Sequence, residues 1–259
     1  MPTIDKPENG KFCWVEANVD DPKAAQAFYG QVFGWSFDEM PMPQGSYAMA
    51  KRGGTQAAGL MKLAAEAKKM GAPSHWLAYV SCEDTDKSTE KAKQLGGKVL
   101  VPPMDVGPGR MSVVQDPSGG TFALWHAKES MGGFLFGETG ALCWNELATT
   151  NVDAAGKFYS GLFGWKTEAM NMGSMVYTIF KNGKDQVGGM MPMPKEMAGA
   201  PTSWTSYFMV ENTDATIGQV KKLGGKVLSP AVDVPNVGRF ATRMDPQGAV
   251  FAVLQPPKS

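Results

Sequence analysis

The chain has 259 residues, a length that suits two domains better than one. Hydrophobic residues make up 43% and charged residues 19%, which supports packed cores and excludes an intrinsically disordered protein. Lys plus Arg and Asp plus Glu both number 25, giving a net charge of zero. We therefore expect no nucleic-acid partner, because such proteins carry a basic footprint.

We expect neither a secretory signal nor a membrane span. The segment Met1 to Lys11 is polar and lacks the apolar stretch of a secretory signal. No apolar run approaches the roughly 18 residues that a membrane span needs. Three cysteines are a low, odd number, typical of reduced thiols. We predict a cytoplasmic protein without a membrane partner, and the sequence leaves monomer and homodimer open.

The strongest feature of the sequence is an internal repeat, which covers nearly the whole chain. Each copy opens with Cys-Trp-x-Glu, continues with Phe-Tyr and Phe-Gly-Trp, and ends with Asp-Pro-x-Gly. The segment Glu129 to Thr139 contains Gly132-Gly133 and is the predicted linker between the copies. The two copies begin these motifs at Cys13, Phe28, Phe33 and Asp116, and at Cys143, Phe158, Phe163 and Asp245.

In chain order, the first copy starts with a strand and a helix. Asp21 is a helix N-cap with Pro22 at the first helical position, and Gly34 ends the helix. A connector is predicted at 64–73, and a second helix at 84–95 closes at Gly96-Gly97. The predicted strands are 12–19, 35–40, 47–51, 57–63, 75–82, 99–101, 110–115 and 121–125.

The second copy repeats this order of elements. It has strands at 141–148 and 204–210, helices at 153–163 and 214–223, and three strands after each helix. The chain therefore contains four βαβββ units. A strand and a helix followed by antiparallel strands predict an α+β protein with helices outside curved sheets.

The ordered set of motifs, present twice, resembles the vicinal oxygen chelate superfamily. That family includes glyoxalase I, bleomycin- and fosfomycin-resistance proteins and extradiol dioxygenases. The resemblance implies that two βαβββ units pair into an incomplete barrel around a small-molecule cavity. It implies two such domains here, at 10–128 and 140–257, with 129–139 as the linker.

Many members of this family bind a divalent metal through three positions on these strands. Carried over by the resemblance, the positions hold Trp14, His75 and Ala123 in the first half, and Trp144, Ser203 and Ala252 in the second. Only His75 can ligate, and Glu16 would add at most a second ligand. Catalytic metal sites normally need three protein ligands. We therefore predict no tightly bound metal and no cofactor.

Glu16 and Glu146 are the candidate catalytic residues, with His75 assisting in the first half only. Strand alternation puts each glutamate on the face of the preceding tryptophan, which lines the cavity in this family. A carboxyl group in an apolar cleft has a raised pKa and can act as acid or base, or bind a ligand. The alternative is a structural ion pair with Arg110 or Arg239 across the barrel.

The candidate ligand-binding residues are aromatic or polar side chains of the same strands. They are Trp14, Trp144, Tyr79, Tyr207, Arg110 and Arg239. The tryptophans either stack on a flat ligand or fill the cavity themselves. Eighteen methionines suit an adaptable apolar pocket, or irregular core space.

These observations favour a protein that binds a small apolar or aromatic metabolite or drug, without the usual metal ligands. An alternative is a metal-independent lyase, isomerase or hydrolase that uses Glu16 or Glu146 as acid or base. A metal-dependent glyoxalase or dioxygenase is the weaker third reading.

Overall fold

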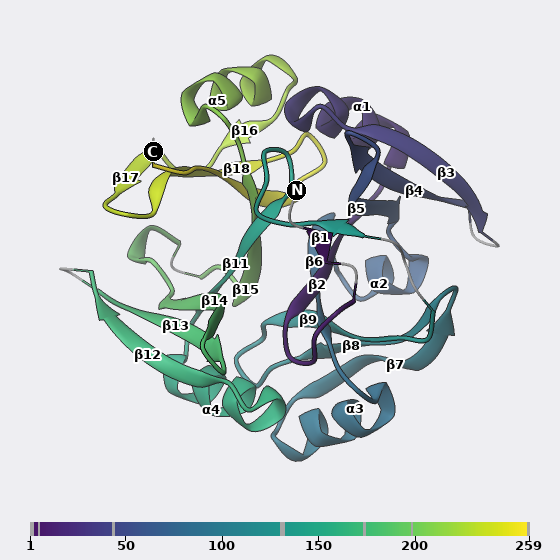
Figure 1. The fold of residues 1–259 in the computed structure, drawn as a ribbon, viewed down its shortest axis with the longest axis vertical. Coiled ribbons are helices and arrows are strands. Elements are labelled where there is room, and N and C mark those ends of the chain that lie inside the picture. The colour runs from purple at the N-terminus through teal and green to yellow at the C-terminus, as the bar shows by residue number, and fades with distance from the viewer. Residues whose placement is uncertain are drawn as a thin grey trace.

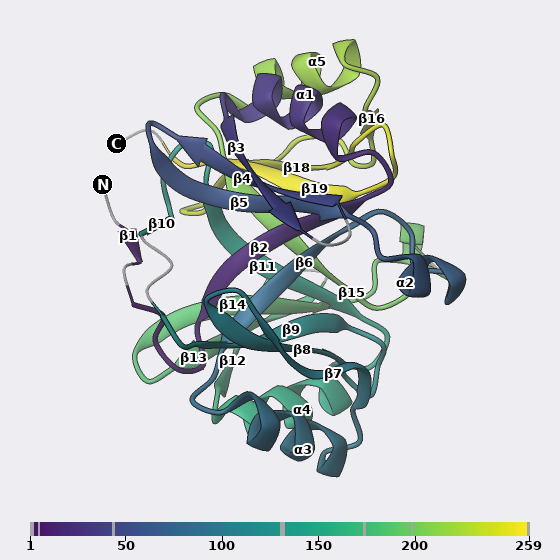
Figure 2. The same ribbon diagram turned by 90° about the vertical axis from the view of Figure 1, so that its right-hand side faces the viewer.

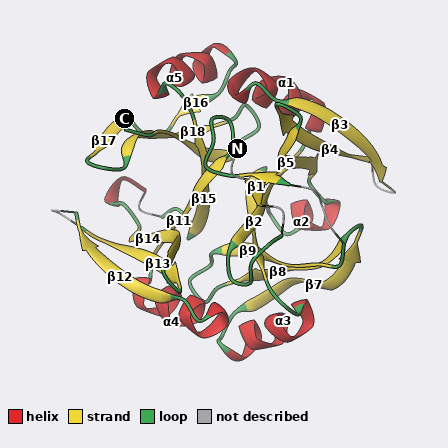
Figure 3. Cartoon of the chain, in the orientation of Figure 1, coloured by secondary structure: helices red, strands yellow, loops and turns green. Residues whose placement is uncertain are grey.

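The computed structural model describes residues 3–4, 6–42, 45–129, 133–172, 175–197 and 199–257. Two curved sheets, one from each half of the chain, lie side by side with helices at both ends (Figure 1, Figure 3). None of the helices in these ranges is long and apolar enough to cross a membrane.

The first sheet joins both units of the first half. Its main strands are β3 (Ser36–Met42), β4 (Gly45–Arg52), β5 (Thr55–Lys62), β2 (Phe12–Val19), β6 (His75–Ser81), β9 (Thr121–Ala127), β8 (Gly109–Gln115) and β7 (Lys98–Val106), in spatial order. β2 pairs antiparallel with β6 and parallel with β5, while β6 pairs parallel with β9. The first strands of the two units thus form the centre of the sheet.

The second sheet has the same topology. Its strands are β12 (Lys166–Asn171), β13 (Val176–Asn182), β14 (Asp185–Pro192), β11 (Leu142–Thr149), β15 (Ser203–Met209), β19 (Val250–Gln255), β18 (Gly238–Met244), β16 (Lys226–Val227) and β17 (Val232–Val234). Here two short strands, β16 and β17, replace the single β7. The predicted α+β class and the four βαβββ units are confirmed.

The helices begin and end where local chemistry predicts. In α1 (Pro22–Phe33), the Asp21 side chain accepts from the backbone N–H groups of Lys23 and Ala24, and Gly34 ends the helix in the left-handed conformation. The other long helices begin after Asp84, Asn151 and Asn212, whose side chains also accept from first-turn N–H groups. They are α3 (Thr85–Gln94), α4 (Val152–Phe163) and α5 (Thr213–Lys222).

The hydrophobic cores form between the halves, although each sheet forms within one half. α1 of the first half lies beside α5 of the second, and α3 lies beside α4 (Figure 2). One core joins the first unit to the fourth and contains Phe33 and Phe251. The other joins the second unit to the third and contains Phe122 and Phe158. The four units therefore form a closed ring, held alternately by strand pairing and by side-chain packing.

The repeated motifs connect the halves at buried hydrogen bonds. Tyr29 donates from Oη to Oδ2 of Asp245 at 2.9 Å, and its counterpart Tyr159 donates to Oδ2 of Asp116 at 2.8 Å. Each tyrosine Oη accepts the indole N–H of a strand tryptophan, Trp76 or Trp204. The Phe-Tyr pairs are therefore core residues.

The Gly-Trp turns make a second pair of contacts between the halves. The indole N–H of Trp35 donates to the carbonyl of Gly140 at 2.6 Å, and that of Trp165 donates to the carbonyl of Gly10 at 2.7 Å. Both indoles are buried, so they belong to the core as well as to the contact between the halves.

Three segments differ from the sequence prediction. The predicted connector 64–73 contains a five-residue helix, α2 (Ala65–Lys69), which lacks a side-chain N-cap. β7 extends to Val106 because it pairs with β8 along its length. The predicted linker contains β10 (Phe134–Leu135), which pairs with β5 and with β1 (Thr3–Ile4) and so extends the first sheet. A 3-10 helix spans Lys195–Met197.

Arg243 is a buried charge in the fourth unit, where the second unit has Val114. Its Nη1 donates to the carbonyls of Ser229 and Thr242, whereas Nε and Nη2 have no partner among the described residues. We expect Arg243→Met to leave the free energy of unfolding unchanged or raise it by about 1–4 kcal/mol, because an incompletely paired buried charge costs desolvation. Urea unfolding would measure this, and a loss above about 2 kcal/mol would contradict it.

Candidate functional site

Each sheet has two chemically different faces. The helix face packs on the helices and carries fully buried residues such as Val15 and Leu60. The opposite face, here called the glutamate face, carries Glu16 in the first half and Glu146 in the second. Directly paired residues of neighbouring strands share a face, so the register decides which side chains accompany each glutamate.

In the first half, Glu16 lies in a cluster of aromatic side chains. Its Oε1 accepts from the hydroxyl of Tyr79 at 3.1 Å and from the amide of Asn18 at 3.2 Å. Tyr47 also hydrogen-bonds the carboxyl group, and its Oη accepts the indole N–H of Trp14 at 2.9 Å. The predicted residues Trp14, Glu16 and Tyr79 are thus brought together.

The second half repeats this cluster. Oε1 of Glu146 accepts from the hydroxyl of Tyr207 at 2.7 Å, and Tyr177 hydrogen-bonds the same carboxyl group. The indole N–H of Trp144 donates to Oη of Tyr177 at 3.0 Å. The structure therefore brings Trp144, Glu146 and Tyr207 together as it does their counterparts.

Tyr47 and Tyr177 were missed by the sequence analysis. Each stands 33 residues after the tryptophan whose N–H it accepts, so the repeat alone could have flagged them. Each lies over a glycine of the neighbouring strand. A Cβ on Gly59 would meet Oη of Tyr47 at 1.9 Å, and one on Gly189 would meet Oη of Tyr177 at 1.8 Å. Glycine is required there because the phenol occupies that space.

Burial governs the protonation of these groups. Desolvation raises the pKa of Glu16 and of Glu146, opposed by hydrogen bonds from the neighbouring phenols. Desolvation together with the nearby carboxyl group also raises the pKa of Tyr79 and of Tyr207 well above the ordinary value. The tyrosines therefore remain donors, and each glutamate is easier to protonate than in water.

A pH series should detect this burial through Glu16→Gln, which is neutral at every pH. Near pH 4 both the folded and the unfolded wild-type chain hold a protonated Glu16. As pH rises past the ordinary value of 4.5, the unfolded chain ionises first, so wild type loses stability relative to the variant until the raised folded pKa is passed. We expect the advantage of Gln in urea unfolding to grow as the pH rises above 4.5.

The control for that series is Glu90→Gln, a change on the exposed side of α3. This variant makes the same change from Glu to Gln at a residue outside the buried cluster. A Glu16→Gln advantage that does not change with pH would contradict a raised pKa of the Glu16 carboxyl.

The arginine predictions need correction. Arg110 pairs with Asp86 and Asp105, and Arg239 pairs with Asp214 and Asp233, all near the protein surface. Both arginines alternate with the residues of the glutamate face and so lie on the other face of their strands. Neither forms the expected ion pair with Glu16 or Glu146, and neither is placed to bind a ligand beside them.

His75 lies at the edge of the first cluster. It pairs in register with Asn18, and its Nδ1 is 2.8 Å from the carbonyl oxygen of Pro73. Burial lowers the pKa of His75, so its neutral form is favoured. It stands four residues along β6 from Tyr79, a separation of about 13 Å in a strand. An assisting role for His75 stays a prediction.

The residues present do not fit the metal that the fold family implies. No group of three or more His, Cys, Asp or Glu side chains in the described ranges could hold an ion. Of the three positions carried over by resemblance, Trp14 and Ala123 both adjoin Tyr79, while His75 stands apart.

The cysteines offer no activated nucleophile. Burial raises the pKa of Cys143 to about 12 and moves that of Cys13 higher still. Both thiols lie against backbone carbonyls of the neighbouring strand. Thiols with so high a pKa hold little of the reactive thiolate, so neither is an activated nucleophile.

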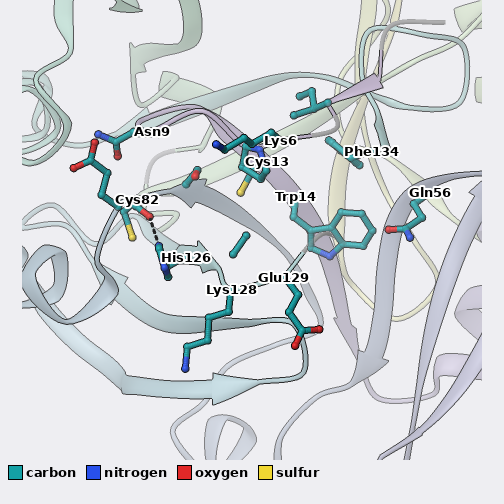
Figure 4. A pocket seen from close by; sticks show the side chains of 15 residues that line it. Lys6, Asn9, Cys13, Trp14, Gln56, Cys82, His126, Lys128, Glu129 and Phe134 are labelled. Atoms are coloured by element: carbon teal, nitrogen blue, oxygen red, sulfur yellow. Dashed lines mark hydrogen bonds between the residues drawn. The ribbon is translucent and has the colours of Figure 1, made fainter. Parts of the chain in front are cut away.

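A pocket of about 530 Å³ lies beyond Trp14 in the first half (Figure 4). Its walls include Cys13, Trp14, His126 and Phe134, together with residues of the N-terminal segment, Ile4, Lys6, Pro7 and Asn9. Glu16 does not line this pocket. Trp14, 4% exposed, lines this pocket and also hydrogen-bonds Tyr47 of the glutamate cluster.

Comparison with a known protein family matches the two halves of the chain separately. A model of the family described as Glyoxalase/Bleomycin resistance protein/Dioxygenase superfamily matches residues 11–124 and again residues 142–253. CFP32 of Mycobacterium tuberculosis, whose name assigns it provisionally to the glyoxylases, is 38% identical over 99% of this chain and 98% of its own. The anthracycline biosynthesis protein DnrV of Streptomyces peucetius is 30% identical over 95% of this chain and 93% of its own.

Solved structures share the fold at low sequence identity. The Mn(II)-bound glyoxalase from Novosphingobium aromaticivorans matches with a TM-score of 0.65 and 15% identity, covering 96% of this chain and 83% of that one. The 2,3-dioxygenase LapB from Pseudomonas sp. KL28 matches with a TM-score of 0.62 and 14% identity, covering 96% and 94%.

Proposed function

Because the chain belongs to the glyoxalase/bleomycin resistance protein/dioxygenase superfamily, we propose that it binds a small apolar or aromatic molecule on the glutamate face of one or both sheets. Residues 10–128 and 140–257 are its two domains in this proposal. The observation that carries it is the repeated cluster of one carboxyl group, two phenols and an indole. The free thiols support a reducing compartment such as the cytoplasm.

The cluster suits a flat ligand with at least one polar oxygen. The indole and phenol rings offer apolar surface at low entropic cost, and the carboxyl group accepts hydrogen bonds when ionised and can donate one when protonated. Methionines extend this surface: Met40 pairs with Tyr47, and Met170 pairs with Tyr177. The relative named for anthracycline biosynthesis supports a fused aromatic ligand.

The test is binding of a hydroxylated fused-ring probe, such as 1,8-dihydroxyanthraquinone, followed by tryptophan fluorescence. We expect the double variant Glu16→Gln/Glu146→Gln to bind the probe at least tenfold more weakly, because its amide cannot reproduce the hydrogen bonds of a carboxyl group. The control Glu90→Gln should bind as wild type does. Equal binding by all three proteins would contradict the proposal.

A second candidate function is metal-independent proton transfer by the same glutamates. Burial raises the pKa of Glu146, which favours this function because a carboxyl group whose pKa is shifted toward the working pH is a better general acid or base. In a lyase, isomerase or hydrolase of this kind, Glu→Gln variants would lose turnover while still binding substrate. Loss of binding and turnover together would favour the binding protein.

A further inference from the structure

We infer that the two glutamate sites are not equivalent, and that only the second is open to a ligand. This inference rests on the proposed function and names the site that carries it. Cys13, Trp14 and Glu16 are 6%, 4% and 5% exposed. Their counterparts on β11, Cys143, Trp144 and Glu146, are all partly exposed.

This difference in exposure arises because a short segment that occurs once in the chain covers the first site. The segment joining the halves leaves the first half and adds β10 to the edge of β5, with β1 alongside. There Phe134, 3% exposed, packs on Trp14 with ring centroids 5.2 Å apart (Figure 4). At the matching edge of the second sheet, Asp185 and Gln186 of β14 are exposed.

The polar groups also differ between the sites. Glu16 has three hydrogen-bonding side chains around it, including Asn18, and faces Leu77 on β6. Glu146 has the two phenols, and Thr205 stands opposite it on β15. The second site therefore places the carboxyl group of Glu146 opposite Thr205, and both residues are partly exposed. This pair suits a ligand oxygen, a phenol or carbonyl, at the edge of an apolar ring system.

Titration of wild type with 1,8-dihydroxyanthraquinone should give one site per chain, and Glu146→Gln should weaken it at least tenfold. Thr205→Val, which removes only the hydroxyl, should weaken it several-fold. Phe134→Ala, which removes the cap ring, should raise the stoichiometry toward two. Two sites in wild type, or one undiminished site in Glu146→Gln, would overturn the inference while leaving the proposed function intact.

An experiment without ligand tests the accessibility of the two sites separately from the proposed function. Hydroxyl-radical footprinting read by mass spectrometry should oxidise Trp144 faster than Trp14 in wild type. Phe134→Ala should speed oxidation of Trp14 and leave Trp144 unchanged. Equal rates for the two tryptophans would overturn the inference. If wild type binds no probe while the footprint shows this difference, the proposed function fails and the accessibility of the second site stands.

Discussion

Residues 1–139, expressed without the second half, are expected to yield no stable monomer, although they contain a complete sheet. The reason is that the helix face of this sheet is covered largely by residues of the second half. Phe33 packs on Phe208 and Phe251, with centroids 4.8 and 5.8 Å apart, and Trp76 lies 4.9 Å from Phe208. These rings would be exposed to water in the isolated half.

The expected loss is large because the same exposure occurs at both ends of the sheet. Phe122 also loses the rings of Phe158 and Tyr159. Each aromatic or aliphatic side chain contributes about 1.5–3 kcal/mol when fully buried. Uncovering several of them costs on the order of 5–10 kcal/mol, comparable to the whole stability of a typical domain.

Gel filtration and thermal unfolding of the half-chain would measure this effect. We expect aggregation, or a dimer in which a second copy covers the exposed rings. Mixing the two halves, 1–139 and 140–259, should restore a folded 1:1 complex. A monomeric half-chain with a cooperative transition near that of the full protein would show that the shared cores are dispensable.

The sequence predicted the elements well where local chemistry decides them. Asp21, Pro22 and Gly34 fix the ends of α1, and the predicted strand 12–19 coincides with β2. It could not predict which unit packs on which, because cross-half contacts such as Tyr29 with Asp245 depend on residues far apart in the chain. α2 was missed because it is short and lacks a side-chain N-cap.

The candidate site was predicted in part for a similar reason. Alternation within one strand relates Trp14 to Glu16, and that relation was found. The place of Tyr47 depends on the register of three strands, in which Tyr47 pairs with Met61 and Met49 pairs with Gly59. The arginines were misplaced because the sequence shows their strand but not the face on which they lie.

Asp245→Ala is expected to lower the free energy of unfolding by about 3 kcal/mol or more, among the largest effects of a single substitution in this protein. Asp245 is 2% exposed. Its Oδ1 accepts from the backbone N–H groups of Gln247 and Ala249, at 2.8 and 2.9 Å, and its Oδ2 accepts from Tyr29. Alanine would leave all three donors unpaired.

The repeat supplies a matched pair for this experiment. Asp116 holds the equivalent turn of the first half, accepting from Ser118, Gly120 and Tyr159. Asp116→Ala should therefore lower the free energy of unfolding as much as Asp245→Ala does, because each carboxylate also accepts a hydrogen bond from a tyrosine of the other half. Chemical unfolding of both variants would measure the two losses.

Conservative variants separate the turn from the contact between halves. Asp245→Asn keeps an acceptor for the backbone N–H groups and should cost less than Asp245→Ala. Tyr29→Phe keeps the ring and the turn but removes the hydroxyl, and should cost about 1–3 kcal/mol because Oδ2 of Asp245 and the indole N–H of Trp76 lose their partner. If Tyr29→Phe were neutral, the hydrogen bond between the halves would contribute nothing, and Asp245 would act only within its own turn.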